Sequence, residues 1–126
     1  MIINRRLTPQ RKVILEYLQS VKTHPTAEEV YKVVKKQFPK ITLATVYRNL
    51  HVLSEDKQAN LLEINGQYHF DGDLSPHLHF ICQNCKIIKD LFLDDLQNYL
   101  QKKFQKSNLS ISNFKIQLDG ICHNCV

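Results

Sequence analysis

The sequence predicts a mixed α/β (α+β) protein in two parts, a winged helix-turn-helix over residues 1–71 and a small α/β domain over residues 72–126. Three short amphipathic helix patterns precede a hairpin signal in the first part. The net charge of +5 lies wholly in residues 1–70, which hold 11 basic and 6 acidic side chains, whereas the remainder hold 6 of each. All four cysteines lie in the second part, which indicates that the two parts have different tasks.

Length and composition exclude several classes of protein. With 126 residues, 43% hydrophobic and 23% charged side chains and only 3 glycines, the chain is neither a disordered nor a collagen-like protein, nor a large multidomain enzyme. Its apolar runs are too short to cross a membrane, and the N-terminal stretch of residues 1–6 is too short for a signal peptide. We therefore expect a cytoplasmic protein without a membrane partner.

Capping residues predict the first two helices. Thr8 is an N-cap followed by a proline at the first helical position, and apolar residues then recur at helical spacing over residues 9–21. Thr26 and Glu29 form a capping box that opens a second helix. This helix is expected to end near Pro39.

The third helix is the candidate for contact with DNA. Thr42 caps residues 43–53, which bury one apolar face and turn small residues, an arginine and an aromatic ring outward. Such a face suits a major groove, because small residues allow close approach and arginine pairs with guanine. An ordinary solvated helix surface is the alternative. The candidate DNA-contacting residues are Ala44, Thr45, Tyr47 and Arg48, with Arg11 of the first helix.

A hairpin is expected to follow the three helices. Residues 61–64 and 67–70 are short strand-like runs separated by Asn65-Gly66, the strongest short signal for a tight hairpin turn. Three helices followed by such a hairpin make a winged helix-turn-helix, with the hairpin as the wing.

The cysteines predict a structural zinc site. Cys82 and Cys85 form one Cys-x-x-Cys pair, and Cys122 and Cys125 form another after 36 intervening residues. Two such pairs are the ligand set of one tetrahedral Zn(II), and disulfides are not expected in a reducing compartment. The alternative, two redox-active pairs, requires a cysteine at a helix N-terminus, and neither pair has that setting.

The second part reads as a small α/β unit that follows a turn at residues 71–76. The expected elements are strands at 77–82 and 86–93, a helix at 94–104 and a last strand at 114–118. In the helix, the spacing predicts four buried side chains, which are Leu96, Tyr99, Leu100 and Phe104.

A second set of potential metal ligands contains no thiol. His77 and His79 are two residues apart on an expected strand, so both imidazoles project from one face. Asp71 in the turn and Asp90 on the neighbouring strand add carboxylates, and this donor set suits Fe(II), Mn(II) or Zn(II). Taken alone, a His-x-His pair is more often plain surface or a hydrogen-bonded core group.

Four segments together resemble the ferric uptake regulator (Fur) family over nearly the whole chain. They are residues 7–11, 24–31, 43–50 and 77–85. The resemblance implies a homodimeric, metal-dependent repressor that binds an inverted-repeat operator in double-stranded DNA. It also implies that residues 1–71 bind DNA, and that residues 72–126 dimerise and bind metal.

Within the family, the chain is most similar to the peroxide-sensing (PerR) branch. The resemblance implies a regulatory Fe(II) or Mn(II) that joins the two domains, held by His24, Asp71, His77, His79 and Asp90. It further implies that Fe(II) reduces peroxide, that His24 or His77 is then oxidised, and that DNA is released. Aspartate at position 71 favours this branch, because iron-sensing members usually carry glutamate there. His69 is a possible additional ligand.

Three other functions compete with peroxide sensing. An iron- or other metal-responsive regulator would use the same five residues only to detect metal. A zinc enzyme such as a deaminase is disfavoured, because the sequence lacks a His-x-Glu motif and four thiolates leave zinc no place for water. We therefore expect no enzymatic activity. A zinc-stabilised protein-interaction module without DNA affinity is the last alternative.

Overall fold

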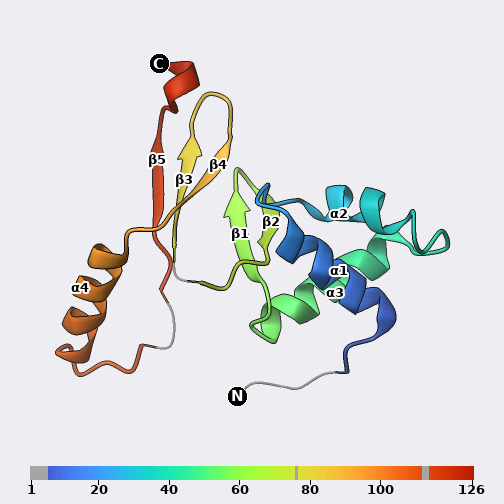
Figure 1. Cartoon of the computed structure of the whole chain (residues 1–126), viewed down its shortest axis with the longest axis horizontal. Coiled ribbons are helices and arrows are strands. Elements are labelled where there is room, and N and C mark those ends of the chain that lie inside the picture. The colour runs from blue at the N-terminus through green and yellow to red at the C-terminus, as the bar shows by residue number, and fades with distance from the viewer. Residues whose placement is uncertain (1–5, 76, 112–113) are drawn as a thin grey trace. The chain divides into compact units, whose positions relative to one another are not determined.

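The chain divides into two compact units, one ending at Leu74 and the other beginning at Ser75. The computed structural model describes residues 6–75, 77–111 and 114–126 (Figure 1). The division falls a few residues after the expected boundary at Asp71. Gly72 explains the difference, because a Cβ placed on it would lie 2.6 Å from the backbone carbonyl carbon of Leu18, and this close approach joins the segment to the first unit. Pro76 of the expected turn and the first five residues lie outside the described residues.

The first unit contains the three predicted helices and the predicted hairpin. The Thr8 hydroxyl accepts the Arg11 amide at the start of the first helix, and Thr26 and Glu29 form both hydrogen bonds of a capping box at the second. The elements are α1 (Pro9–Ser20), α2 (Ala27–Val34), α3 (Leu43–Glu55), β1 (Asn60–Ile64) and β2 (Gln67–Asp71).

The second helix is shorter than expected. It ends at Val34, and the expected continuation to Pro39 is wrong. Two successive amides, those of Gln37 and Phe38, both donate to the Val34 carbonyl and close a turn. Phe38 packs against the core from this turn, so its expected burial is observed in part although the helix ends before it.

The wing is an antiparallel pair of strands with a two-residue turn. β1 and β2 pair from Asn60 opposite Asp71 to Ile64 opposite Gln67. Asn65 and Gly66 have φ angles of 53° and 77°, the positive values that a type I′ turn requires at both central positions. The hairpin prediction is confirmed.

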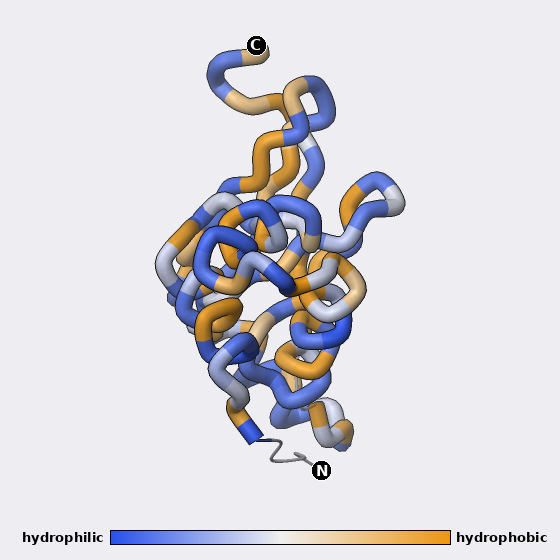
Figure 2. Tube along the Cα trace, turned by 90° about the vertical axis from the view of Figure 1, so that its right-hand side faces the viewer, coloured by the Kyte–Doolittle hydropathy of each residue, from blue (hydrophilic) through white to orange (hydrophobic). Residues whose placement is uncertain are grey.

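The helices and the wing share one apolar core. Hydrophobic and hydrophilic stretches alternate along the trace, as amphipathic elements require (Figure 2). Phe70 of β2 is fully buried and joins the wing to the helices. The other buried members of this core are Ile14, Leu18, Ala27, Val30, Val34, Ile41, Val46, Leu50, Leu53 and Ala59.

The described part of the second unit contains one three-stranded sheet and one α-helix. The strand order is β4-β3-β5, with β3 antiparallel to β4 and parallel to β5. The elements are β3 (Leu78–Cys82), β4 (Ile88–Leu91), α4 (Asp94–Gln105), β5 (Gln117–Gly120) and a short 3₁₀ turn, η1 (His123–Cys125). The mixed α/β fold class is confirmed.

The strands of this unit differ from their expected bounds. β4 is shorter than residues 86–93, because Lys86 turns the chain with a φ of 65°. The last strand begins at Gln117, and Phe114 lies before it with its ring centroid 5.1 Å from that of Phe104. Packing on α4 therefore replaces the expected strand pairing of Phe114.

The expected burial of the α4 face is wrong for two residues. Leu96 is 39% exposed and Tyr99 57% exposed, whereas Gln97 is buried. Leu100 and Phe104 are half-buried. The amphipathic spacing identified a helix, but the described part of this chain supplies too few neighbours to cover its apolar face. No described helix is both long enough and apolar enough to cross a membrane.

We expect Leu50→Ala to lower the free energy of unfolding by roughly 2–5 kcal/mol, because it empties a fully buried position of the core. Urea denaturation of the zinc-loaded protein measures this change. Val33→Ala is the matched control, since Val33 is 38% exposed on a helix, and its effect should stay within about 0.5 kcal/mol. Equal losses for the two variants would contradict the assignment of the core.

Candidate metal centres and nucleic-acid interface

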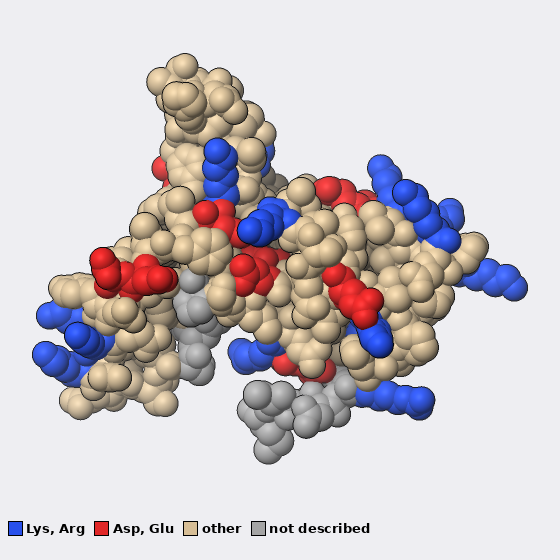
Figure 3. All heavy atoms as spheres, viewed as in Figure 1, with Lys and Arg blue, Asp and Glu red and all other residues tan. Residues whose placement is uncertain are grey.

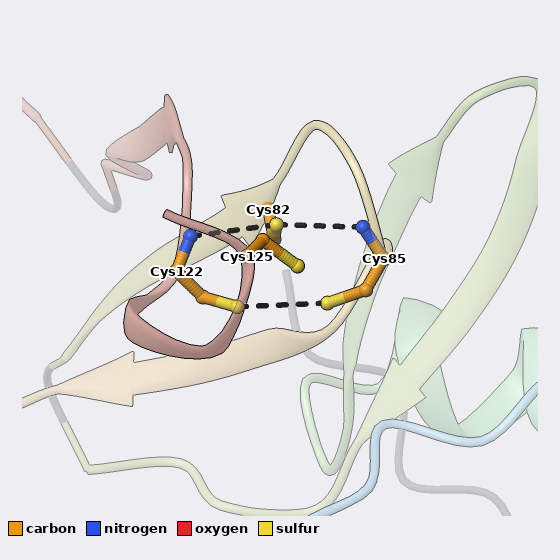
Figure 4. A group of neighbouring side chains, drawn as sticks. All are labelled: Cys82, Cys85, Cys122 and Cys125. Carbon is orange, nitrogen blue, oxygen red and sulfur yellow. Dashed lines mark hydrogen bonds between the residues drawn. The ribbon is translucent and has the colours of Figure 1, made fainter.

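The four cysteines converge on one point of the second unit (Figure 4). Cys82 ends β3 and Cys85 lies in the turn toward β4. Cys122 caps the 3₁₀ turn η1, and Cys125 is the last residue of that turn. All four sulfur atoms lie within 4.8 Å of one another, and the Cys85 and Cys122 sulfurs are 3.7 Å apart. Tetrahedral zinc with bonds of about 2.3 Å requires sulfurs about 3.8 Å apart, so the arrangement fits Zn(II).

Backbone amides prepare this site for a thiolate. The Cys85 and Cys122 amides both donate to the Cys82 sulfur at 3.4 Å. The amides of Cys122 and Cys85 lower the pKa of the Cys82 thiol to about 5. Because a thiolate and not a thiol binds zinc, this ligand is ready for metal at neutral pH.

The same unit presents a second donor set with different chemistry. His79 lies opposite Asp90 in the β3–β4 register, and His77 precedes β3. The Nε2 atoms of the two histidines are 3.0 Å apart, and each lies 3.5 Å from Asp90 Oδ1. Two ligands at right angles, each about 2.1 Å from one ion, would be about 3 Å apart. The three donors therefore have the spacing of a shared metal site.

A backbone carbonyl orients one of these imidazoles. His77 Nδ1 lies 2.6 Å from the Ser75 carbonyl oxygen. A carbonyl only accepts hydrogen bonds, so Nδ1 carries the proton and the lone pair of Nε2 faces His79 and Asp90. Metal-binding histidines typically donate their second ring N–H in this way.

The first unit brings together the other two candidate ligands. His24 lies between α1 and α2, and Asp71 is the last residue of β2. Both side chains are buried, and His24 Nε2 is 3.6 Å from Asp71 Oδ2. Asp71 Oδ1 accepts the Asp73 amide at 2.9 Å, which fixes the carboxylate. An imidazole and a carboxylate held in this way match the chemistry of the other donor set.

His24 has a strained backbone. Its φ of 53° lies in the left-handed region, and this costs a residue other than glycine on the order of 1–3 kcal/mol. The candidate additional ligand, His69, has Nδ1 2.7 Å from the His24 carbonyl oxygen. Sequence reasoning found both histidines but not this contact, because residues 24 and 69 meet only through the tertiary fold.

The exposed face of α3 carries the candidate DNA contacts. Ala44 and Arg48 are exposed, and Thr45 and Tyr47 are half-buried. On the face drawn in Figure 3, lysine and arginine side chains gather over α2 and the turn after it. The exposed lysines of this segment are Lys32, Lys35, Lys36 and Lys40.

Two residues that sequence reasoning missed fix the candidate contacts in place. The Tyr47 hydroxyl donates to Glu28 Oε1 at 3.1 Å, and burial together with Glu28 raises the pKa of Tyr47. The buried Asn49 accepts from Arg11 Nε at 3.1 Å, while the Arg6 carbonyl accepts from the same guanidinium. The only sequence feature that pointed to this role of Asn49 was its place as a polar residue on the inner side of α3.

The first unit is a winged helix-turn-helix. The second unit has a four-thiolate cluster and, apart from it, a set of histidine and aspartate side chains. Together these features define a metal-binding protein of the winged-helix class. Residues 3–119 match the Ferric uptake regulator family. The chain belongs to this family, and the resemblance carried by the sequence motifs is confirmed.

Similar proteins include regulators whose names refer to peroxide. The peroxide operon regulator of Bacillus subtilis (strain 168) is 36% identical over 121 residues, which are 95% of this chain and 83% of that protein. The peroxide-responsive repressor PerR of Staphylococcus aureus (strain USA300) is 33% identical over 121 residues, 95% of this chain and 82% of that protein.

Solved structures share the fold. The Campylobacter jejuni peroxide stress regulator has a TM-score of 0.82 and 30% identity, with 93% of this chain and 89% of that chain covered. The Helicobacter pylori ferric uptake regulator Fur has a TM-score of 0.80 over 92% of this chain and 81% of that one, and at 20% identity it supports the fold alone.

We expect Cys122→Ser to abolish stable zinc binding, because one of four thiolates is lost and serine is a poor ligand for zinc. Zinc measured by elemental analysis should fall from about one ion per chain to a small fraction, and the thermal unfolding temperature should drop. His123→Ala, a change at the next and exposed residue, should retain the zinc. Full zinc content in Cys122→Ser would remove this cysteine from the site.

Proposed function

We propose that this protein is a metal-dependent transcriptional repressor that senses peroxide. The observation that carries the proposal is the histidine and aspartate donor set, which consists of His24 and Asp71 in the first unit and His77, His79 and Asp90 in the second. Three imidazoles and two carboxylates without sulfur suit Fe(II) or Mn(II). The zinc cluster supplies a separate, structural function.

In this proposal, one regulatory ion is bound by all five residues. Its ligands would come from both compact units, so binding would hold the units at one angle. In a homodimer, that angle sets the separation of the two α3 helices on an inverted repeat. Metal binding and DNA binding would then strengthen each other by linkage.

The two candidate sensor residues are His24 and His77. Fe(II) held by these residues would supply the redox chemistry that activates peroxide. One oxygen atom of the peroxide would be inserted into a C–H bond of the His24 or His77 ring, which gives up two electrons, and the other oxygen atom would leave as water. The modified ring would be a poorer ligand. With a ligand lost from either unit, the DNA-competent arrangement would no longer be held together.

Position 71 favours peroxide sensing over simple metal sensing. Aspartate stands where iron-sensing members of the family usually carry glutamate, and two relatives with more than 30% identity are named as a peroxide operon regulator and a peroxide-responsive repressor. The aspartate side chain is one methylene shorter than glutamate, so its carboxylate reaches less far toward a metal, and the Asp73 amide restrains the Asp71 carboxylate further. A regulator that responds to iron or another metal without sensing peroxide is the second candidate function.

The remaining assignments follow from the same proposal. The exposed face of α3, with Arg48 at its centre, would enter the major groove of an operator. The exposed apolar residues of α4, including Leu96 and Tyr99, suit burial against a second copy.

Four thiolates complete the coordination of zinc and leave no open position for hydrolysis, so we assign no enzymatic activity. A regulator of this kind works in the cytoplasm, where it meets its DNA.

Peroxide should abolish DNA binding only when iron occupies the regulatory site. Zinc-loaded protein is compared on an inverted-repeat duplex with Fe(II), with Mn(II) and without added metal, under anaerobic conditions, before and after brief peroxide. We expect binding with either metal, and loss of binding only in the Fe(II) sample. Peptide mass spectrometry should then find one added oxygen atom on the peptide of His24 or His77.

The Mn(II) sample is the matched control, because the same ligands hold a metal that does not undergo this reaction. DNA binding that depends on metal but survives peroxide in the Fe(II) sample would replace peroxide sensing with metal sensing. Binding that needs no metal would reject the regulatory site altogether.

Arg48→Ala should weaken operator binding by roughly 10- to 100-fold and reduce discrimination against unrelated DNA, because a base-contacting guanidinium is removed. Fluorescence anisotropy at several salt concentrations measures both effects. Lys102→Ala removes an equal charge from an exposed position on α4 and should leave affinity within about twofold. An unchanged affinity in Arg48→Ala would place this residue outside the interface.

A further inference from the structure

His24 adopts a backbone conformation that is unfavourable for a residue with a side chain and for a residue that precedes proline. Its φ is 53°, and Pro25 follows it. A side chain with a Cβ disfavours the left-handed region, and a following proline restricts the backbone further toward extended conformations. Contacts from elsewhere in the fold must therefore stabilise this conformation.

Strand β2 supplies these contacts through two consecutive residues. His69 Nδ1 lies 2.7 Å from the His24 carbonyl oxygen, and the Phe70 amide donates to the Pro25 carbonyl at 2.9 Å. Because the His24 carbonyl only accepts, His69 Nδ1 carries the proton in this bond. β2 thus donates to the carbonyl groups of both His24 and Pro25, once from the His69 side chain and once from the Phe70 backbone.

The next residue of the same strand is the proposed ligand Asp71. Its carboxylate lies 3.6 Å from His24 Nε2, so residues 69–71 contact His24 at both its backbone and its ring. Side chains alternate between the two faces of a strand, which places His69 and Asp71 on the same face. One face of β2 therefore contacts both the carbonyl group and the ring of His24.

We propose that His69 is a positioning residue and not a ligand: its Nδ1–H group holds His24 in the left-handed conformation that presents the His24 imidazole beside Asp71. This inference rests on the proposed function, because it takes His24 and Asp71 to be ligands of the regulatory ion. It resolves the role of His69 that the sequence left open.

Two substitutions separate the hydrogen bond from the size of the side chain. His69→Asn keeps an amide donor at the position of Nδ1, whereas His69→Leu has a similar size and no donor. His69→Val, which suits a strand, repeats the donor-free test if the leucine variant does not fold. Zinc content and the thermal unfolding temperature serve as folding controls.

The first measurement uses zinc-loaded protein without regulatory metal or DNA. The NMR coupling between the amide and α protons of His24, together with the strong intraresidue NOE between them, reports its positive φ. We expect wild type and His69→Asn to keep this signature and His69→Leu to lose it. Unchanged values in a folded His69→Leu protein would overturn the positioning role.

The second measurement is Mn(II) affinity, determined by electron paramagnetic resonance of the free ion. Loss of a residue that orients a ligand typically costs roughly 10- to 100-fold in metal affinity, and we expect such a loss for His69→Leu. His69→Asn should stay within a few fold of wild type. Rescue by asparagine is the result that a direct ligand would not give. His69 Nδ1 is bonded to the His24 carbonyl, so a ligating His69 would use Nε2, and the shorter asparagine side chain has no atom at that position.

The remaining outcome would assign His69 to the metal itself. If both variants lose affinity equally and the absorption spectrum of bound Co(II) shows the loss of a nitrogen donor, His69 is a ligand and the inference is wrong. None of these measurements involves peroxide or DNA. A failed positioning role is therefore distinguishable from a failed peroxide-sensing function, and the φ measurement remains decisive even if wild type binds no Mn(II).

Discussion

The second unit depends on its four cysteines more than on an apolar core. Among its described residues, only Leu78, Ile81, Cys82 and Cys122 are buried hydrophobic side chains. A unit of this size with so small a core would be marginal without a further cross-link. Zinc bound by the two Cys-x-x-Cys pairs would join the turn after β3 to the end of the chain and so hold β5 against β3. The pairing of β5 with β3 is therefore expected to depend on the structural metal.

The sheet in turn determines the geometry of the second donor set. β3 ends in Cys82 and carries His79 near its start, opposite Asp90 on β4. The spacing of His79 and Asp90 is therefore a property of one antiparallel pair of strands. A loss of zinc would be expected to disturb the proposed regulatory ligands through β3, although the two sites use different donors. Soft thiolates and harder imidazole and carboxylate groups allow one unit to bind two metals without exchanging them.

In the first unit, β2 has a comparable role. It forms the wing with β1, buries Phe70 in the helical core and ends at Asp71. It also contacts the segment that carries His24 through side-chain and backbone hydrogen bonds. The wing and the proposed ligands thus share one strand, and α3 packs on the same core. A strained residue at the end of such a network is typical of sites whose geometry must be fixed before a ligand arrives.

The sequence by itself determined the elements and the chemistry of the donors. Caps at Thr8, Thr26 and Thr42, the Asn65-Gly66 turn and the cysteine spacing are local signals, because each acts within a few residues. Family motifs added His24, which no spacing rule connects to the other ligands. Only the tertiary structure decided where α2 ends, that Leu96 and Tyr99 remain exposed, and that Glu28 and Asn49 hold Tyr47 and Arg11. It also decided that His69 bonds to the His24 carbonyl, because contacts between residues far apart in the chain depend on how the elements pack and not on the order of the residues.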